Sequence, residues 1–132
     1  SIKDTQLKQS IIAINPNWLT KPKLGEMFKP IVEDARSARA YGSAALEIIY
    51  VATGKLDAYI TPRLQPWDFA GGLIILHEVN GVASNLAGAT LSITSANSIV
   101  IANKQLHNEL LTSYFNYHQD TITVLHERMQ QK

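Results

Sequence analysis

The chain has 132 residues, of which 45% are hydrophobic and 17% charged; these proportions exclude a disordered chain and fit one folded domain. Its net charge of +1, without a basic stripe, gives no electrostatic support for a nucleic-acid partner, and its apolar runs are too short to span a membrane. The absence of cysteine removes disulfides and thiolate metal sites, and it favours the reducing cytoplasm as the compartment.

The first third of the chain predicts a strand, a helix and a short extended segment. Residues 10–14 form a β-branched run that predicts a buried strand. Apolar residues recur at helical spacing through residues 24–37 and predict a helix, while Pro30 inside it predicts a kink or two shorter pieces. Residues 38–41 follow as a brief extended piece.

The middle of the chain predicts a helix, a strand and a second helix. Ser43 is a plausible N-cap for a helix that runs to about residue 53, with Gly54 as its stop. Residues 56–61 alternate as a strand does, and Pro62 is expected to end it. The next helix, residues 66–79, is apolar nearly all round, so we expect burial on more than one side.

The last third predicts strands at residues 82–86 and 98–102 and a helix at residues 104–118, with residues 120–132 as a terminal helix or tail. This order predicts a single α/β domain over residues 1–132, with helices packed on a mixed, largely parallel sheet. In such sheets ligands bind at the carboxyl ends of strands and the N-termini of helices. The chemically unusual ends are residues 41–44 and 66–68.

Asp68 is the strongest candidate functional residue. It lies in the first turn of the predicted helix 66–79, between a tryptophan and three small residues at 70–72. An acid there can simply complement the helix dipole, or it can be an oxygen ligand for Mg²⁺. One carboxylate cannot complete a metal site, and the other acids lack close paired spacing. Asp57 is expected to bond backbone at the Gly54–Lys55 turn.

Five segments occur in a specific order along the chain: RAYGSAAL at 39–46, YVATGKLDAY at 50–59, PWDFAGG at 66–72, HEVNG at 77–81 and VIAN at 100–103. Together they resemble the C-terminal signature of the inositol monophosphatase family of Mg²⁺-dependent, lithium-sensitive phosphatases. The resemblance covers roughly residues 10–111 and implies the C-terminal half of that family's fold.

The resemblance implies roles for particular residues. Asp68 would hold the second of two or three Mg²⁺ ions, near the leaving-group oxygen, and the loop of Gly42, Ser43 and Ala44 would face the alcohol portion of a small phosphorylated substrate. Thr61 stands where inositol phosphatases carry a glutamate that grips ring hydroxyls, so the preferred substrate stays open. Arg63 either meets a second anionic group or lies on a solvated loop.

Much of the family's site is absent from this sequence. No D-P-x-D-G-[ST] segment is present, and the resemblance implies that this segment and the general-base threonine belong to an N-terminal half preceding Ser1. We therefore expect no catalytic residue in this chain, a missing N-terminal domain as partner, and a homodimeric parent. The alternatives are a fructose bisphosphatase-like or nucleotide 3′-phosphatase-like member, and a non-catalytic dimerisation or ligand-binding domain.

The histidines do not complete a site in the sequence. His77 follows Asp68 by nine residues, which places it on the other side of the same helix. His107, His118 and His126 lie in the terminal helices without ligand pairing, so we expect structural or surface roles.

Overall fold

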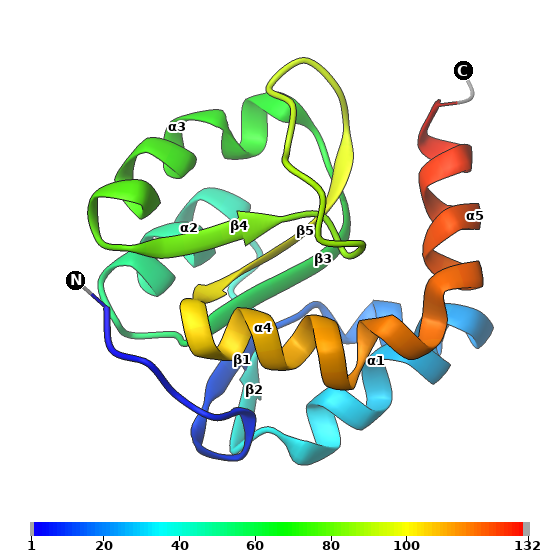
Figure 1. Cartoon of the computed structure of the whole chain (residues 1–132), viewed down its shortest axis with the longest axis horizontal. Helices are drawn as coiled ribbons and strands as arrows, with labels where there is room; N and C mark the ends of the chain where they lie inside the picture. Colours follow the sequence, from blue (N-terminus) through cyan, green and yellow to red (C-terminus); the bar gives the residue numbers. More distant parts are fainter. Residues whose placement is uncertain (1, 131–132) are drawn as a thin grey trace.

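A computed structural model describes residues 2–130 and shows one mixed sheet of five strands in the order β2-β1-β3-β5-β4 (Figure 1). The β1 strand is parallel to β2 and β3, whereas β5 is antiparallel to β3 and β4. The predicted α/β class with a mixed sheet is confirmed. The strands are β1 (Ile11–Ala13), β2 (Ser37–Arg39), β3 (Ala58–Leu64), β4 (Gly81–Ser84) and β5 (Asn97–Asn103).

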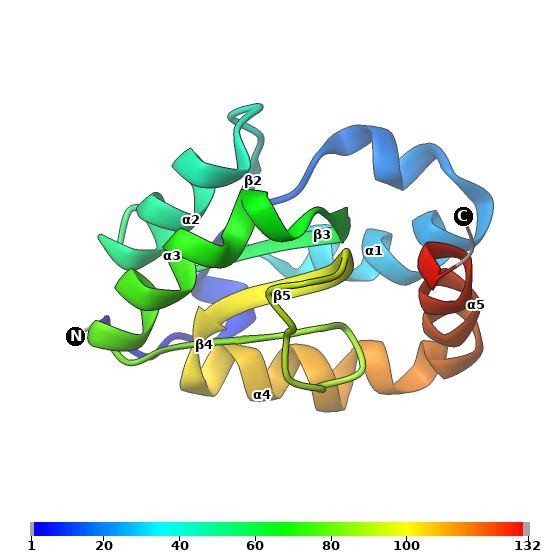
Figure 2. The same cartoon turned by 90° about the horizontal axis from the view of Figure 1, so that it is seen from above.

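Helices cover both faces of the sheet. Figure 2 shows α2 and α3 on one face and α4 on the other, with α5 beside the edge of the layered body. Within residues 2–130, no helix combines the length and apolar character needed to cross a bilayer. The helices are α1 (Pro22–Asp34), α2 (Ala44–Ala52), α3 (Pro66–Glu78), α4 (Lys104–Ser113) and α5 (Gln119–Gln130), with short 3₁₀ turns η1 (Leu7–Gln9), η2 (Pro16–Thr20) and η3 (Phe115–His118).

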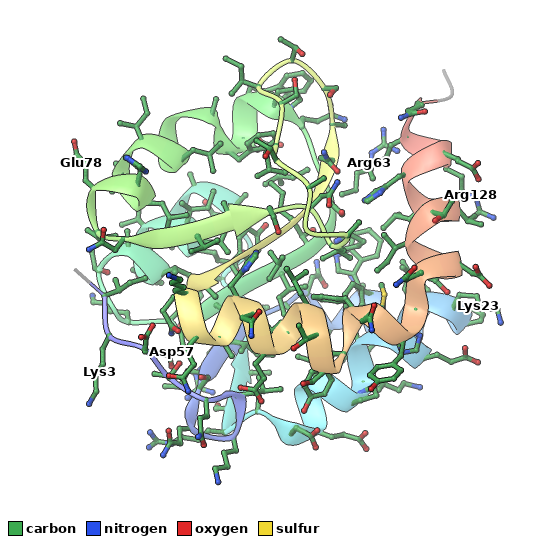
Figure 3. The ribbon with its side chains drawn as sticks, in the orientation of Figure 1. Lys3, Lys23, Asp57, Arg63, Glu78 and Arg128 are labelled. Atoms are coloured by element: carbon green, nitrogen blue, oxygen red, sulfur yellow. The ribbon has the colours of Figure 1, made fainter. Side chains whose placement is uncertain are left out.

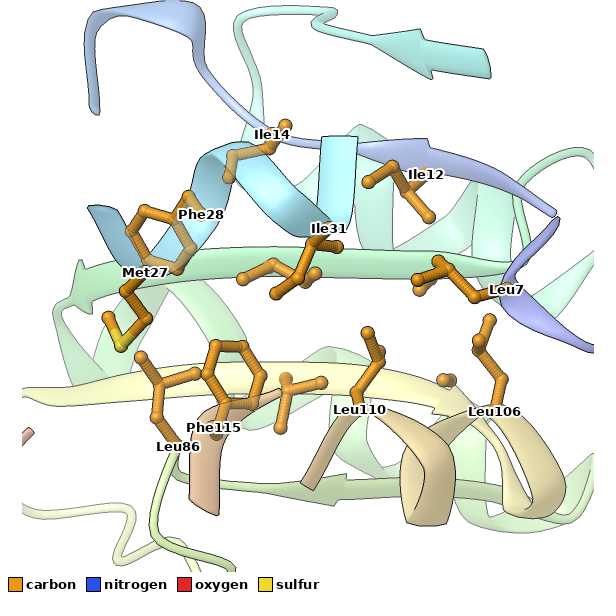
Figure 4. Packing of buried hydrophobic residues seen from close by; sticks show 14 of the residues in the cluster. Leu7, Ile12, Ile14, Met27, Phe28, Ile31, Leu86, Leu106, Leu110 and Phe115 are labelled. Carbon is orange, nitrogen blue, oxygen red and sulfur yellow. The ribbon is translucent and has the colours of Figure 1, made fainter. Parts of the chain in front are cut away.

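Successive side chains on β3 pack into two hydrophobic clusters, one on each face of the sheet. Ala58 and Ile60 join the larger cluster, the α1/α4 core, whereas Tyr59 joins the smaller α2/α3 core. Figure 4 shows the α1/α4 core, in which the rings of Phe28 and Phe115 meet edge to face with centroids 6.3 Å apart. The α2/α3 core also contains Ala13, Ile48, Val51, Leu56, Phe69, Leu76, Ile99 and Ile101.

Pro62 does not end β3, so that prediction is wrong. The strand continues to Leu64, and its pairing with β5 shifts register between Thr61, opposite Ile99, and Leu64, opposite Asn97. Three steps on β3 therefore match two on β5, which is a β-bulge. A proline is tolerated there because its missing N–H is not needed in the interrupted ladder.

Pro30 lies inside α1, which forms one helix, so the alternative of two shorter helices is wrong. Buried Met27 and Phe28 precede the proline, and buried Ile31 follows it. This packing on both sides of Pro30 holds the helix together despite the lost backbone hydrogen bond. The predicted helix 104–118, by contrast, is divided: α4 ends at Ser113, and η3 begins after Tyr114.

The α3 helix is buried on one side only, so the expectation of burial on several sides is wrong. Phe69 and Leu76 are buried, and Gly72 lies so close to Ile48 of α2 that an added Cβ would be 2.6 Å from its Cγ2. On the other side Trp67 is 78% exposed and Ile74 68% exposed. We call Trp67, Ala70, Gly71 and Ile74, together with the 64%-exposed Ile93, the α3 outer face.

Two histidines attach α4 and α5 to the sheet. His107 Nε2 of α4 lies 2.7 Å from Ser84 Oγ of β4, and His126 Nε2 of α5 lies 2.7 Å from Ser98 Oγ of β5. Burial lowers the pKa of both imidazoles below the usual value. The expected structural roles of these two histidines are confirmed, and in each the neutral imidazole is the folded form.

These pairs predict a loss of stability in mild acid. When the pKa of a histidine is lower in the folded state, the unfolded state takes up the proton first as the pH falls. The folded state is therefore at its most stable above the unfolded pKa, about 6.5, and the free energy of unfolding decreases as the pH falls below that value. We expect the free energy of unfolding in urea to fall from pH 7.5 to pH 5.5. Replacing both residues by glutamine should reduce that fall, whereas replacing the exposed His77 by asparagine should not. An unchanged pH dependence in the double variant would contradict the assignment.

Candidate functional site

The candidate site is a cleft at the carboxyl edge of the parallel strands. Because β1, β2 and β3 run in parallel, their carboxyl ends meet at one edge, where α2 and α3 also begin. The cleft there encloses about 510 Å³, a volume typical of small-molecule sites. Four predicted site residues line it, Gly42, Ser43, Ala44 and Thr61, and they are joined by Asn15, Trp18, Ala40, Tyr41, Glu47, Tyr59, Ile60 and Leu64.

The Gly42–Ala44 loop forms one wall and opens α2. Gly42 has a φ of +76°, a left-handed conformation that favours glycine. Ser43 Oγ accepts a hydrogen bond from Leu46 N at 3.2 Å, which confirms the predicted N-cap. The free N–H groups and positive end of α2 therefore face the cleft, an arrangement suited to oxygen-rich or anionic ligands.

The opposite wall comes from β3. Tyr59 and Thr61 are two residues apart, so both side chains project to the α2/α3 face, and both are 6% exposed. Thr61 Oγ1 donates to the carbonyl oxygen of Arg63 at 3.2 Å. Burial, with the nearby carboxylates of Glu47 and Asp68, raises the pKa of Tyr59. The phenol therefore stays protonated and keeps a hydrogen-bond donor at this wall.

Glu47 is the functional candidate that the sequence did not single out. It belongs to the first turn of α2 and lines the cleft, although only 6% of it is exposed. Its Oε2 accepts a hydrogen bond from Tyr41 N at 3.3 Å, and burial raises the pKa of its carboxyl. Its position one helical turn after Ser43 was the only sequence signal, and that position equally indicates a helix start.

Asp68 is the third residue of α3 and is half-buried, and it is not among the residues that line the cleft, of which Leu64 is the nearest in sequence. Its Oδ2 accepts a hydrogen bond from Gln65 N at 3.3 Å, as in a capping box, while within residues 2–130 its Oδ1 accepts none. The same described residues contain no group of three or more His, Cys, Asp or Glu side chains arranged to hold a metal ion. One free carboxylate oxygen fits a shared Mg²⁺ site, and the metal role of Asp68 stays a prediction.

Arg63 and Asp57 lie at opposite ends of β3 (Figure 3). Arg63 is exposed and is not among the residues lining the cleft, so its contact with substrate stays a prediction. Asp57 Oδ2 accepts from Ile11 N at 2.8 Å, and Asp57 N donates to Ile11 O at 2.7 Å. The expected turn contact of Asp57 is therefore wrong: this carboxylate joins β3 to β1.

The fold and the cleft define the class of protein: an α/β domain that presents two helix N-termini, each with an acid in its first turn, at the carboxyl edge of a mixed sheet. The model of the inositol monophosphatase family matches residues 3–120, so the chain belongs to that family.

Relatives with known names agree with this assignment. The inositol-1-monophosphatase of Bacillus subtilis is 37% identical over 117 residues, which are 87% of this chain and 44% of that protein. The fructose-1,6-bisphosphatase/inositol-1-monophosphatase of Thermotoga maritima is 34% identical over 87 residues, 66% of this chain and 34% of that protein.

Solved structures from Staphylococcus aureus are similar to this chain over nearly its whole length. The inositol monophosphatase-II of that organism is 65% identical, with a TM-score of 0.93, over 96% of this chain and 47% of that chain. SaIMPase-II has been crystallised with inositol monophosphate (TM-score 0.94) and with 2′-AMP (TM-score 0.93), again at 65% identity over 96% of this chain. This chain spans about half the length of these relatives.

Proposed function

We propose that this chain is the C-terminal half of a Mg²⁺-dependent phosphatase that hydrolyses a small phosphate monoester. It supplies one metal ligand, Asp68, and the pocket that receives the alcohol portion of the substrate. The observation that supports this most strongly is the cleft itself, which gathers the Gly42–Ala44 loop and Thr61 beside the start of α3. The 65%-identical SaIMPase-II with bound inositol monophosphate supports the substrate class.

The residues of this chain would bind and orient the substrate. The N-terminus of α2 offers N–H donors to substrate oxygens, and the protonated Tyr59 phenol offers another from β3. Asp68 would hold a metal ion through its Oδ1. When bound, Mg²⁺ polarises the phosphate, activates water and stabilises the departing alkoxide. The water-activating threonine and the remaining carboxylates belong to the other half of the protein.

The α3 outer face is where we place that other half. It presents Trp67, Ala70, Gly71 and Ile74 at helical i, i+3, i+4, i+7 spacing, and no side chain of residues 2–130 approaches a Cβ built on Gly71 within 4 Å. An apolar stripe this exposed is typical of a surface that another part of the protein covers. The stripe begins one residue before Asp68, so a domain on it would bring its carboxylates to the metal ligand. We further propose a homodimeric, cytoplasmic parent.

We expect the 132-residue chain alone to show negligible phosphatase activity and only weak Mg²⁺ binding. One carboxylate cannot supply the several oxygen ligands that Mg²⁺ requires. Phosphate release from inositol monophosphate and p-nitrophenyl phosphate, with Mg²⁺ present, checks this against the protein that also contains the preceding half. Robust hydrolysis of either substrate by the isolated chain would contradict the proposal that both halves of the protein contribute to the active site.

A nucleotide or sugar phosphate is the second candidate substrate. This chain has Thr61 at the β3 position where the family resemblance implies a carboxylate. The aromatic side chains of Trp18 and Tyr41 line the same cleft. Two relatives support this candidate: SaIMPase-II, which has been crystallised with 2′-AMP, and the fructose-1,6-bisphosphatase/inositol-1-monophosphatase of Thermotoga maritima. Substrate profiling of the longer protein, with and without Arg63→Ala, distinguishes the candidates. A non-catalytic dimerisation domain would instead dimerise in light scattering and take up no Mg²⁺.

A further inference from the structure

The substrate pocket lacks a carboxylate on β3 but has one on α2. The family resemblance implies a hydroxyl-binding glutamate on β3, at the position where this chain has Thr61. The Oγ1 of Thr61 already donates a hydrogen bond to the carbonyl oxygen of Arg63. Glu47 lines the same cleft from the facing helix. A carboxylate therefore reaches the alcohol pocket, although from a different element.

The surroundings of Glu47 leave its carboxylate short of donors. A carboxylate has about four acceptor positions. Within residues 2–130, Glu47 accepts one hydrogen bond, from Tyr41 N at 3.3 Å, and forms no ion pair. Burial raises the pKa of this carboxyl, since few protein groups offset its desolvation. Hydroxyl groups of a bound ligand are the donors that would satisfy it.

Tyr59 completes the binding surface from the opposite wall. Its phenol is close enough to Glu47 for the carboxylate to raise its pKa further, after burial. A protonated phenol both donates and accepts, whereas an ionised Glu47 only accepts. A ligand with adjacent hydroxyls can satisfy both groups, whereas an aryl phosphate offers no donor to Glu47.

We propose that Glu47 is the hydroxyl-binding carboxylate of this pocket, accepting hydrogen bonds from adjacent hydroxyls of a polyol phosphate with Tyr59 on the facing wall. This inference rests on the proposed phosphatase function and names its substrate class. It assigns to α2 the role that a glutamate on β3 has in the resembled phosphatases. The competing explanation is that Glu47 only fixes the Tyr41–Gly42 loop through its bond to Tyr41 N.

Glu47→Gln and Glu47→Ala separate the two explanations. Glutamine keeps an oxygen that can accept from Tyr41 N but removes the charge, whereas alanine removes both. Kinetics are measured on the protein containing both halves, with inositol monophosphate as polyol substrate and p-nitrophenyl phosphate as a substrate without free hydroxyls. Glu33→Gln is the matched control, because Glu33 is exposed on α1 and is not among the residues that line the cleft.

We expect Glu47→Gln to lower kcat/KM for inositol monophosphate roughly tenfold or more, mainly through KM, because hydrogen bonds to charged groups contribute most to such discrimination. Turnover of p-nitrophenyl phosphate should stay within about twofold. Adding Thr61→Glu to Glu47→Gln should restore part of the preference for inositol monophosphate. The control should behave like the wild type.

Other outcomes overturn the inference in distinguishable ways. Equal losses on both substrates, or a loss in Glu47→Ala with none in Glu47→Gln, would leave Glu47 a loop-fixing residue. Unchanged kinetics in both variants would remove it from the pocket. If the wild-type protein hydrolysed neither substrate, the proposed function itself would fail, and this inference with it.

Discussion

Replacing Asp68 by asparagine in the protein that carries both halves is expected to lower Mg²⁺-dependent kcat/KM by about 100-fold or more, because a bound metal supplies several kcal/mol of transition-state stabilisation. Asparagine retains an oxygen that can accept from Gln65 N, so the start of α3 should persist. The loss should therefore appear in phosphate release, with the far-UV circular dichroism spectrum unchanged.

Asp120→Asn is the matched control for Asp68→Asn. Asp120 is also an acid in the first turn of a helix, but that helix is α5, whereas α3 begins two residues after Leu64 of the cleft lining. If Asp68 only complemented the helix dipole, the two variants would behave alike, with changes of a few tenths of a kcal/mol in stability and little change in activity. That similarity would overturn the ligand assignment.

Phe28→Ala is expected to reduce the free energy of unfolding of this chain by about 3–5 kcal/mol. Phe28 is fully buried, and its ring meets Phe115 edge to face at 6.3 Å, joining α1 to the turn after α4. Removal of the ring leaves a cavity in the α1/α4 core. A domain of this size has a total stability of about 5–15 kcal/mol, so the variant should be close to unfolding at room temperature.

Urea unfolding followed by circular dichroism measures this effect. Tyr117→Ala is the control, because Tyr117 is 75% exposed in η3, close in sequence to Phe115. We expect the control to change stability by no more than about 0.5 kcal/mol. A loss below about 1 kcal/mol for Phe28→Ala would mean that the α1/α4 core relaxes around the missing ring and is not the closely packed centre described above.

Most of the fold could be predicted from the sequence because its signals are local. Ser43 as N-cap, Gly54 with a φ of +81°, and the continuous β-branched run of β5 each depend on near neighbours. The errors have long-range causes. Pro62 was misjudged because the bulge that accommodates it depends on pairing with β5, and the exposed side of α3 depends on what covers it in space.

The candidate site could be predicted only in part. Gly42, Ser43, Ala44 and Thr61 were identified from motifs, and the structure brings them together around one cleft. Glu47 and Tyr59 were missed because their places in the cleft lining arise from the packing of α2 against β3. The alternation that pairs Tyr59 with Thr61, and the single turn from Ser43 to Glu47, were signals available in the sequence. Arg63 lies outside the cleft lining, which no local pattern indicated.

The number of Mg²⁺ ions bound by the protein containing both halves, measured by isothermal titration calorimetry, tests the shared-site account most directly. We predict that Asp68→Asn binds one Mg²⁺ fewer per chain than the wild type, or binds that ion at least about tenfold more weakly, because the proposed carboxylate ligand of that ion is lost. Asp120→Asn should match the wild type. The same number of ions, bound with unchanged affinity by Asp68→Asn, would contradict the account.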